Sequence, residues 1–145
     1  MNLADKEEAK VQELEETYLF NYHSYFIPFL NEHEYILENY VVNYIFESMF
    51  PNMSTDKVFK QYIKMATIFS MIKVHFVGIS GHYKGINTDL AIKIIQSFVR
   101  SIEHNSSYLD GIMGLLEENG FTSVAHIASL LKDRNKLAYA GEVSE

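Results

Sequence analysis

Residues 56–85, DKVFKQYIKMATIFSMIKVHFVGISGHYKG, form the longest helical pattern in the chain. At about 100° per residue the apolar side chains gather into one stripe: Val58, Tyr62, Met65, Phe69, Ile72 and Phe76. The opposite side carries Lys57, Lys60, Lys64 and Thr67. We therefore expect an amphipathic helix with one face toward a core and the other toward water.

Lys73 breaks this pattern, because it lies only about 50° from the centre of the apolar stripe, with Phe69 and Phe76 as neighbours. Two interpretations remain open. The alkyl chain can lie on the core while the ammonium reaches water at its edge. Alternatively, the ammonium is partly desolvated and held by a carboxylate from a facing helix, an arrangement often found at functional sites.

Composition indicates one domain with a sizeable core. The chain has 145 residues, of which 48% are hydrophobic, and it includes 10 Tyr and 10 Phe. That is too apolar for a disordered chain and too short for several domains. The formal net charge is −7, and no basic arm or stripe dominates, so we expect no nucleic-acid partner.

The chain contains no cysteine. This excludes a disulfide framework, a thiol nucleophile and an iron–sulfur cluster held by this chain alone. The charged N-terminus lacks the apolar segment of a secretory signal. The most apolar run, residues 66–79, is interrupted by Lys73 and His75 and is too short to span a bilayer. We expect a soluble, cytoplasmic protein without a membrane partner.

In the N-terminal third of the chain, the sequence pattern predicts two helices joined by an aromatic linker. Residues 4–20 have helical spacing, and residues 21–31 are aromatic and contain Pro28, which ends or bends a helix. Asn31 and Glu34 have capping-box spacing before a second helix, residues 32–50, which is apolar almost all round and therefore expected to be central. Its polar stripe is either a thin solvated edge or an internal network: Asn39, Asn43 and Glu47.

The C-terminal half predicts three shorter helices. Asn87 or Thr88 caps a helix that continues to about residue 105, Ser107 with Asp110 resembles a capping box, and residues 119–120 are a C-cap pair. Thr122 caps a last helix to about Lys132. In the central helix, Gly78 and Gly81 favour close helix packing.

No segment alternates at a period of two, so we predict an all-α fold. The chain is expected to be a single-domain bundle of about six helices with a long central helix. Residues 1–34 form an N-terminal helix and aromatic linker, residues 35–132 the core helices, and residues 133–145 a loose tail.

Catalytic and metal-binding motifs are scarce. The sequence lacks HExxH, a Glu three residues before any His, a serine-hydrolase elbow and dinucleotide-binding glycines. His75 and His82 are seven residues apart and could share a helix face, but two ligands without a carboxylate make a weak site. The residues alone predict a helical domain with a few polar side chains in unexpected places.

Three segments together resemble a known family. They are LENYVVNYIFESMFP (residues 37–51), SMIKVHFVGISGHYKG (residues 70–85) and IKIIQSFVRSIEHN (residues 92–105). The sequence resembles the C-terminal helical region of the flagellin lysine-N-methylases of the FliB type, over residues 35–131.

The resemblance implies an S-adenosylmethionine-dependent methyltransferase that modifies flagellin lysines and carries a cysteine-rich cluster-binding motif outside this region. This chain departs from that pattern, because it has no cysteine. It is either a fragment of a longer enzyme or a stand-alone relative, and in both cases we expect no methyl transfer by the chain alone. The implied partners are flagellin and the cysteine-rich part of the parent enzyme. S-adenosylmethionine and an iron–sulfur cluster are implied only for the full-length enzyme.

The resembling segments contain the polar residues that periodicity marks as out of place. We hypothesise that three helices bring them into one network: Glu38, Asn39, Asn43, Lys73, His75, Gln96, Arg100, Glu103 and His104. Glu38 or Glu103 would then be the counter-ion of Lys73. Such a network could brace the cluster domain, line one wall of a substrate site, or serve stability only.

Two further functions are compatible with the sequence. A stand-alone interaction or homodimerisation module would expose Tyr22, Tyr25 and Phe26 as a partner surface. A helical domain that binds small ligands is the other, although no basic DNA-reading helix accompanies it.

Overall fold

The computed structural model describes residues 3–48, 55–121 and 123–131. Within these ranges the chain is helical and contains no strand, which confirms the predicted all-α fold with a long central helix. The elements are α1 (Leu3–Asn21), the π-helical turn η1 (Tyr22–Phe26), α2 (Ile27–Glu47), α3 (Thr55–Tyr83), α4 (Thr88–Phe98), the π-helical turn η2 (Val99–Glu103), α5 (Ser106–Glu118) and α6 (Val124–Leu131). The predicted tail, residues 133–145, lies outside the described ranges, as do Thr122 and Lys132.

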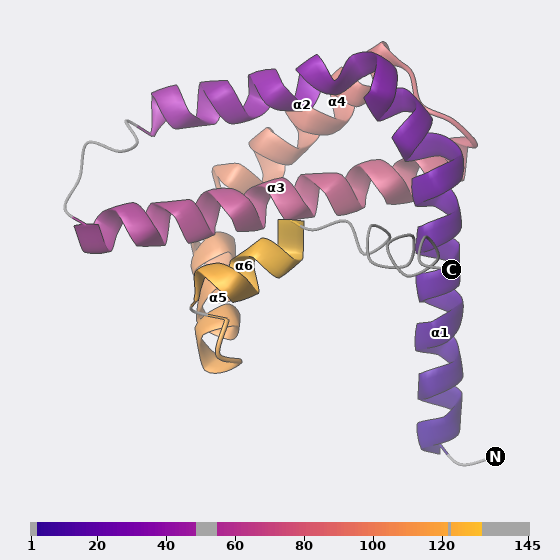
Figure 1. Ribbon diagram of the computed structural model, residues 1–145, viewed down its shortest axis with the longest axis horizontal. Coiled ribbons are helices and arrows are strands. Elements are labelled where there is room, and N and C mark those ends of the chain that lie inside the picture. Colours follow the sequence, from indigo (N-terminus) through magenta and orange to yellow (C-terminus); the bar gives the residue numbers. More distant parts are fainter. Residues whose placement is uncertain (1–2, 49–54, 122, 132–145) are drawn as a thin grey trace, which may run out of the picture.

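The helices are arranged around α3. Figure 1 shows α2 and α3 running in opposite directions, with α4 crossing behind them. The short helices α5 and α6 lie on the other side of α3 from α2, and α1 leaves the assembly at a steep angle.

The main core forms where α3 meets the aromatic residues of η1 and α2. Phe76 of α3 is fully buried. Its ring packs edge-on against Phe26, with centroids 6.1 Å apart, and lies 6.4 Å from the ring of Phe29. Ala91, Ile94 and Phe98 of α4 close the same core. A second, smaller cluster joins α3 to α6 through Ile63, Ala66 and Ile127.

The single apolar stripe predicted for α3 is only partly correct. Ile72 and Phe76 are fully buried, whereas Val58, Tyr62, Met65 and Phe69 are half-buried. Thr67, which we expected to face water, is buried and donates its hydroxyl to the carbonyl of Ile63 at 2.8 Å. The reason is that α3 is covered on more than one side, by η1 and α4 and also by α6.

The aromatic linker predicted at residues 21–31 is also helical. Pro28 is the second residue of α2 and closely follows the π-helical turn η1. The break comes later, at His33, whose φ of −132° and ψ of 31° are not helical. Asn31 lies inside α2, so the predicted capping box at Asn31 and Glu34 does not begin a helix.

Burial of the linker aromatics overturns a predicted partner surface. Tyr22 and Phe26 are buried in the core, and Tyr25 is half-buried. They are therefore not a free interaction patch.

The prediction that α2 is the central helix is wrong. Its side chains Val42 and Phe46 are 41% and 77% exposed. Asn39, Asn43 and Glu47 are exposed as well, which agrees with the solvated-edge interpretation of that stripe.

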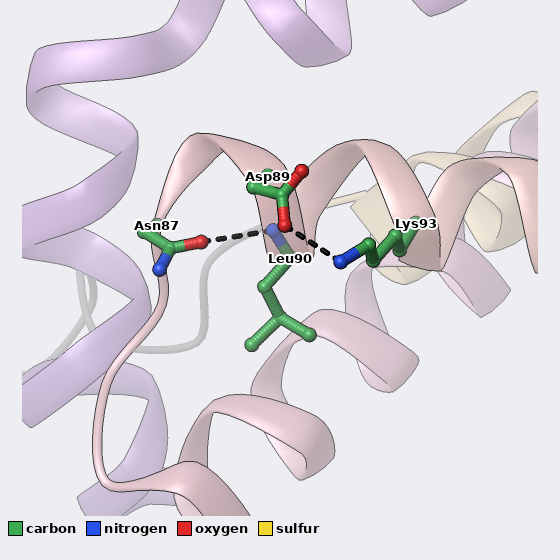
Figure 2. Close-up of polar contacts among 4 residues, drawn as sticks. All are labelled: Asn87, Asp89, Leu90 and Lys93. Atoms are coloured by element: carbon green, nitrogen blue, oxygen red, sulfur yellow. Dashed lines mark hydrogen bonds and ion pairs between the residues drawn. The ribbon is translucent and has the colours of Figure 1, made fainter.

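Of the four predicted caps that lie on described residues, the Asn31 cap is absent, two are confirmed and one is displaced. Asn87 caps α4 by accepting a hydrogen bond from the Leu90 amide at 2.9 Å (Figure 2). Gly120, with φ of 75°, follows the end of α5 as predicted. Asn105 rather than Ser107 opens α5, because its side chain accepts from the Tyr108 amide at 3.2 Å.

Length and composition alone would allow part of α3, Val58–Tyr83, to cross a bilayer. The expectation that no segment is long enough rested on residues 66–79 and was too strict. Core helices pass the same test, and Ile72, Phe76 and Val77 are fully buried against other elements of the domain. Packing therefore accounts for the apolar composition of α3.

The two glycines near the end of α3 have different surroundings. A Cβ atom at Gly81 would overlap the side-chain amide of Asn21, at the end of α1. A Cβ atom at Gly78 would meet nothing within 4 Å. A side chain at position 81 would therefore have to displace the Asn21 side chain, whereas one at position 78 would displace nothing.

We expect Gly78→Ala to raise the free energy of unfolding by up to about 1 kcal/mol, because alanine has the higher helix propensity. Gly81→Ala has the same propensity gain but displaces Asn21, so we expect it to be about 1–3 kcal/mol less stable than Gly78→Ala. Urea unfolding of both variants measures the difference. Equal stability of the two variants would show that α1 does not pack against α3 as described.

We expect Phe76→Ala to destabilise the domain by about 3–5 kcal/mol, because it removes a fully buried ring and leaves a cavity. Phe46→Ala is the matched control, because that ring is 77% exposed and should cost little. Thermal unfolding followed by circular dichroism compares the two. A similar loss in both variants would contradict the position of the core.

Candidate functional site

A surface groove with a volume of about 530 Å³ lies between the C-terminal half of α3 and α4. Its apolar lining residues are Ile79, Leu90, Ile94, Phe98 and Ile102. The other lining side chains carry polar groups: His75, Tyr83, Lys93, Ser97 and Ser101. An apolar lining with a few polar groups is the usual composition of a binding pocket.

His75 contributes a hydrogen-bond acceptor to this groove. Its Nδ1 lies 2.7 Å from the carbonyl oxygen of Met71. A carbonyl oxygen can only accept, so Nδ1 is the donor and, in the neutral ring, Nε2 is left as an acceptor. The ring also packs edge-on against Phe98, with centroids 5.5 Å apart. Together the two contacts hold the imidazole at the side of the groove.

The start of α4 positions Lys93 beside the groove. After the turn at Lys84 and Gly85, both with positive φ, Asn87 caps the helix and Asp89 lies in its first turn, where the helix dipole favours a negative charge. Figure 2 shows Asp89 reaching one turn along α4 to Lys93, with Nζ 2.7 Å from the carboxylate oxygen.

The Asp89–Lys93 contact places an ammonium, paired with a carboxylate, beside the groove. The hydrogen bond from Lys93 and the negative charge of Asp89 both raise the pKa of Lys93 above its ordinary value. A raised pKa means that the contribution of this pair to stability is present at neutral pH and is lost only as the pH rises through the pKa of Lys93. Both side chains are largely exposed, so that contribution is small.

A second, polar pocket of about 260 Å³ lies where α2, α3 and the end of η2 meet. It is lined by Tyr44, Glu47, Ser48, Gln61, Lys64 and His104. It combines a carboxylate, an ammonium and an imidazole from three separate parts of the chain. Sequence reasoning missed this grouping because Gln61 and Lys64 read as ordinary polar positions on a helix face.

The nine residues of the hypothesised network lie on different surfaces. Glu38, Asn39 and Asn43 are exposed on α2, and Gln96 and Arg100 are exposed on α4 and η2. His75 lines the α3–α4 groove and His104 lines the polar pocket. The side chain of Glu103 lies outside the described part of the structure. Because the Glu103 side chain is not described, a network that joins all nine residues stays a prediction.

Lys73 has a contact that its sequence position did not indicate. The side chain is half-buried, and its Nζ lies 5.1 Å from the centroid of the Tyr22 ring. The ring face attracts the ammonium by a cation–π interaction of about 0.5–2 kcal/mol. The partner belongs to η1, 51 positions earlier in the chain, and helical periodicity within α3 gives no information about it.

The residues present do not fit an iron–sulfur cluster, because the chain has no cysteine to ligate one. In the described part of the chain, no group of three or more His, Asp or Glu side chains is placed to hold a metal ion. The pair His75 and His82 does not form part of such a group.

Comparison with known proteins assigns the family. A family model described as the FliB lysine N-methylase C-terminal domain matches residues 2–130, which is most of the chain. No match was found among curated proteins or among solved structures. The match runs from α1 to residue 130, one residue before the end of α6. The chain therefore belongs to the family of the FliB lysine N-methylase C-terminal domain.

Proposed function

We propose that this domain is the substrate-holding, non-catalytic part of an S-adenosylmethionine-dependent lysine N-methylase that acts on flagellin. In this proposal a segment of flagellin lies in the α3–α4 groove while a cysteine-containing part of the enzyme performs the chemistry. The observation that carries the proposal is the groove itself. Its apolar lining can bury side chains of a bound segment, and Lys93, His75 and the two serines can hydrogen-bond to it.

In this proposal the residues of the groove do not perform the chemistry of methyl transfer. S-adenosylmethionine and an iron–sulfur cluster belong, in our proposal, to the cysteine-containing part, because this chain supplies no thiolate. A cysteine-free chain is compatible with the reducing cytoplasm, where we place the protein.

The first test measures the binding of purified flagellin to the chain by isothermal titration calorimetry. Ser97→Trp places a large ring in the groove at an exposed position, and we expect it to weaken flagellin binding at least tenfold. Asn39→Trp is the matched control on the exposed face of α2 and should bind as the unmodified chain does. Both variants should keep their melting temperatures.

A second measurement addresses the chemistry. With S-adenosylmethionine carrying a labelled methyl group, we expect the chain alone to incorporate no label into flagellin. Incorporation by the chain alone would overturn the non-catalytic role. Absence of flagellin binding, together with a dimer in sedimentation equilibrium, would favour the alternative of a stand-alone dimerisation module.

A further inference from the structure

Helix α1 projects from the rest of the domain. In Figure 1 it descends from the end of α3, and its N-terminus lies far from the other helices. Every residue from 5 to 17 is exposed, and contact with the domain begins only at the half-buried Tyr18 and Leu19. The projecting stretch, residues 5–17, is about as short as the isolated helices that are marginal in water.

The apolar stripe that attaches α1 to the domain continues along the projecting part. Tyr18 and Tyr22 lie on one face of the helical chain, and their rings stack with centroids 6.2 Å apart at the main core. Val11 and Leu14 extend the same face outward at helical spacing. They are 62% and 61% exposed. The stripe is thus covered at its inner end and open to solvent at its outer end.

The projecting part is strongly acidic. Residues 5–16 contain six acidic side chains and two lysines, a net charge of −4. The whole chain has a net charge of −7, so this short segment accounts for more than half of it. Glu7 and Glu8 are exposed beside the Val11–Leu14 stripe.

Charge and area argue against a second copy of the chain as the partner. Two α1 helices would bring two segments of charge −4 together. Among the described side chains of the projecting part, they would cover Val11 and Leu14 of each protomer, far less than the roughly 800 Å² per partner of a stable interface. A partner with lysines beside its own apolar stripe is complementary in both respects.

We propose that α1 binds a basic, amphipathic segment of the protein substrate, with its apolar side chains on Val11 and Leu14 and its lysines near Glu7 and Glu8. This rests on the proposed function, since the substrate of a lysine N-methylase must present lysines. The binding is weak and falls with ionic strength, because the acidic side chains are exposed and screened by salt. Helix α1 and the α3–α4 groove then hold two different parts of one substrate.

The direct test uses a synthetic, fluorescein-labelled amphipathic helix of leucine and lysine as the probe, and fluorescence anisotropy as the readout. We expect Glu7→Lys with Glu8→Lys to weaken binding at least tenfold, and Val11→Ser with Leu14→Ser at least fivefold. Raising the salt from 20 to 300 mM should weaken binding to the unmodified chain by a similar factor.

The matched control reverses two other adjacent, exposed glutamates, Glu117 and Glu118 at the end of α5. Glu117→Lys with Glu118→Lys changes the net charge equally, so it should leave probe binding within twofold. Equal weakening by both charge reversals would show that only net charge attracts the probe and would overturn the inference. A dimer in sedimentation equilibrium that Val11→Ser with Leu14→Ser abolishes would also overturn it.

Flagellin binding separates this inference from the proposed function. If the α1 variants bind flagellin as the unmodified chain does while Ser97→Trp does not, the inference is wrong and the proposed function stands. If flagellin does not bind at all but the leucine–lysine probe still binds at α1, the proposed substrate is wrong while the basic-segment site remains. Val11 and Leu14 are mainly exposed, so their serine variants should keep the fold. Circular dichroism checks this.

Discussion

The packing of Phe76 against Phe26 and Phe29 is the contact on which the rest of the structure depends. It joins the C-terminal third of α3 to a segment some 50 residues earlier in the chain. The geometry of η1 and the start of α2 follows from it. A π-helical turn before Pro28 and a break at His33 allow an almost continuous helix to present Tyr22, Phe26 and Phe29 to α3.

The burial of α3 on several sides explains how the two candidate surfaces arise. With η1 and α4 on one side and α6 on another, α3 leaves a strip of its C-terminal half exposed next to α4. That strip becomes the groove, because the cap at Asn87 begins α4 immediately after a tight turn. The end of α1 packs closely on α3 where Asn21 meets Gly81, while Val11 and Leu14 farther along α1 are mainly exposed.

Family membership and structure bear on different parts of the proposed function. The family match connects the chain to lysine N-methylation. The structure presents open binding surfaces, and its residues do not fit a cluster. A division of labour, with substrate held here and chemistry performed by cysteine-containing residues elsewhere, is compatible with both.

The sequence by itself determined the helical class, the long central helix and a cap at Asn87 or Thr88, because local periodicity and capping chemistry are written within a few residues. The resemblance to the family rests instead on the three quoted segments. The sequence also marked His75 and Lys73 as unusual. Only the tertiary structure decided that Thr67 is buried, that α2 is not the central helix, that Lys73 lies over Tyr22, and that Gln61, Lys64 and His104 line one pocket. Each of these depends on which helix covers which face. Periodicity describes one helix at a time, so it assigns an inside and an outside but does not identify the neighbours that α3 has on several sides.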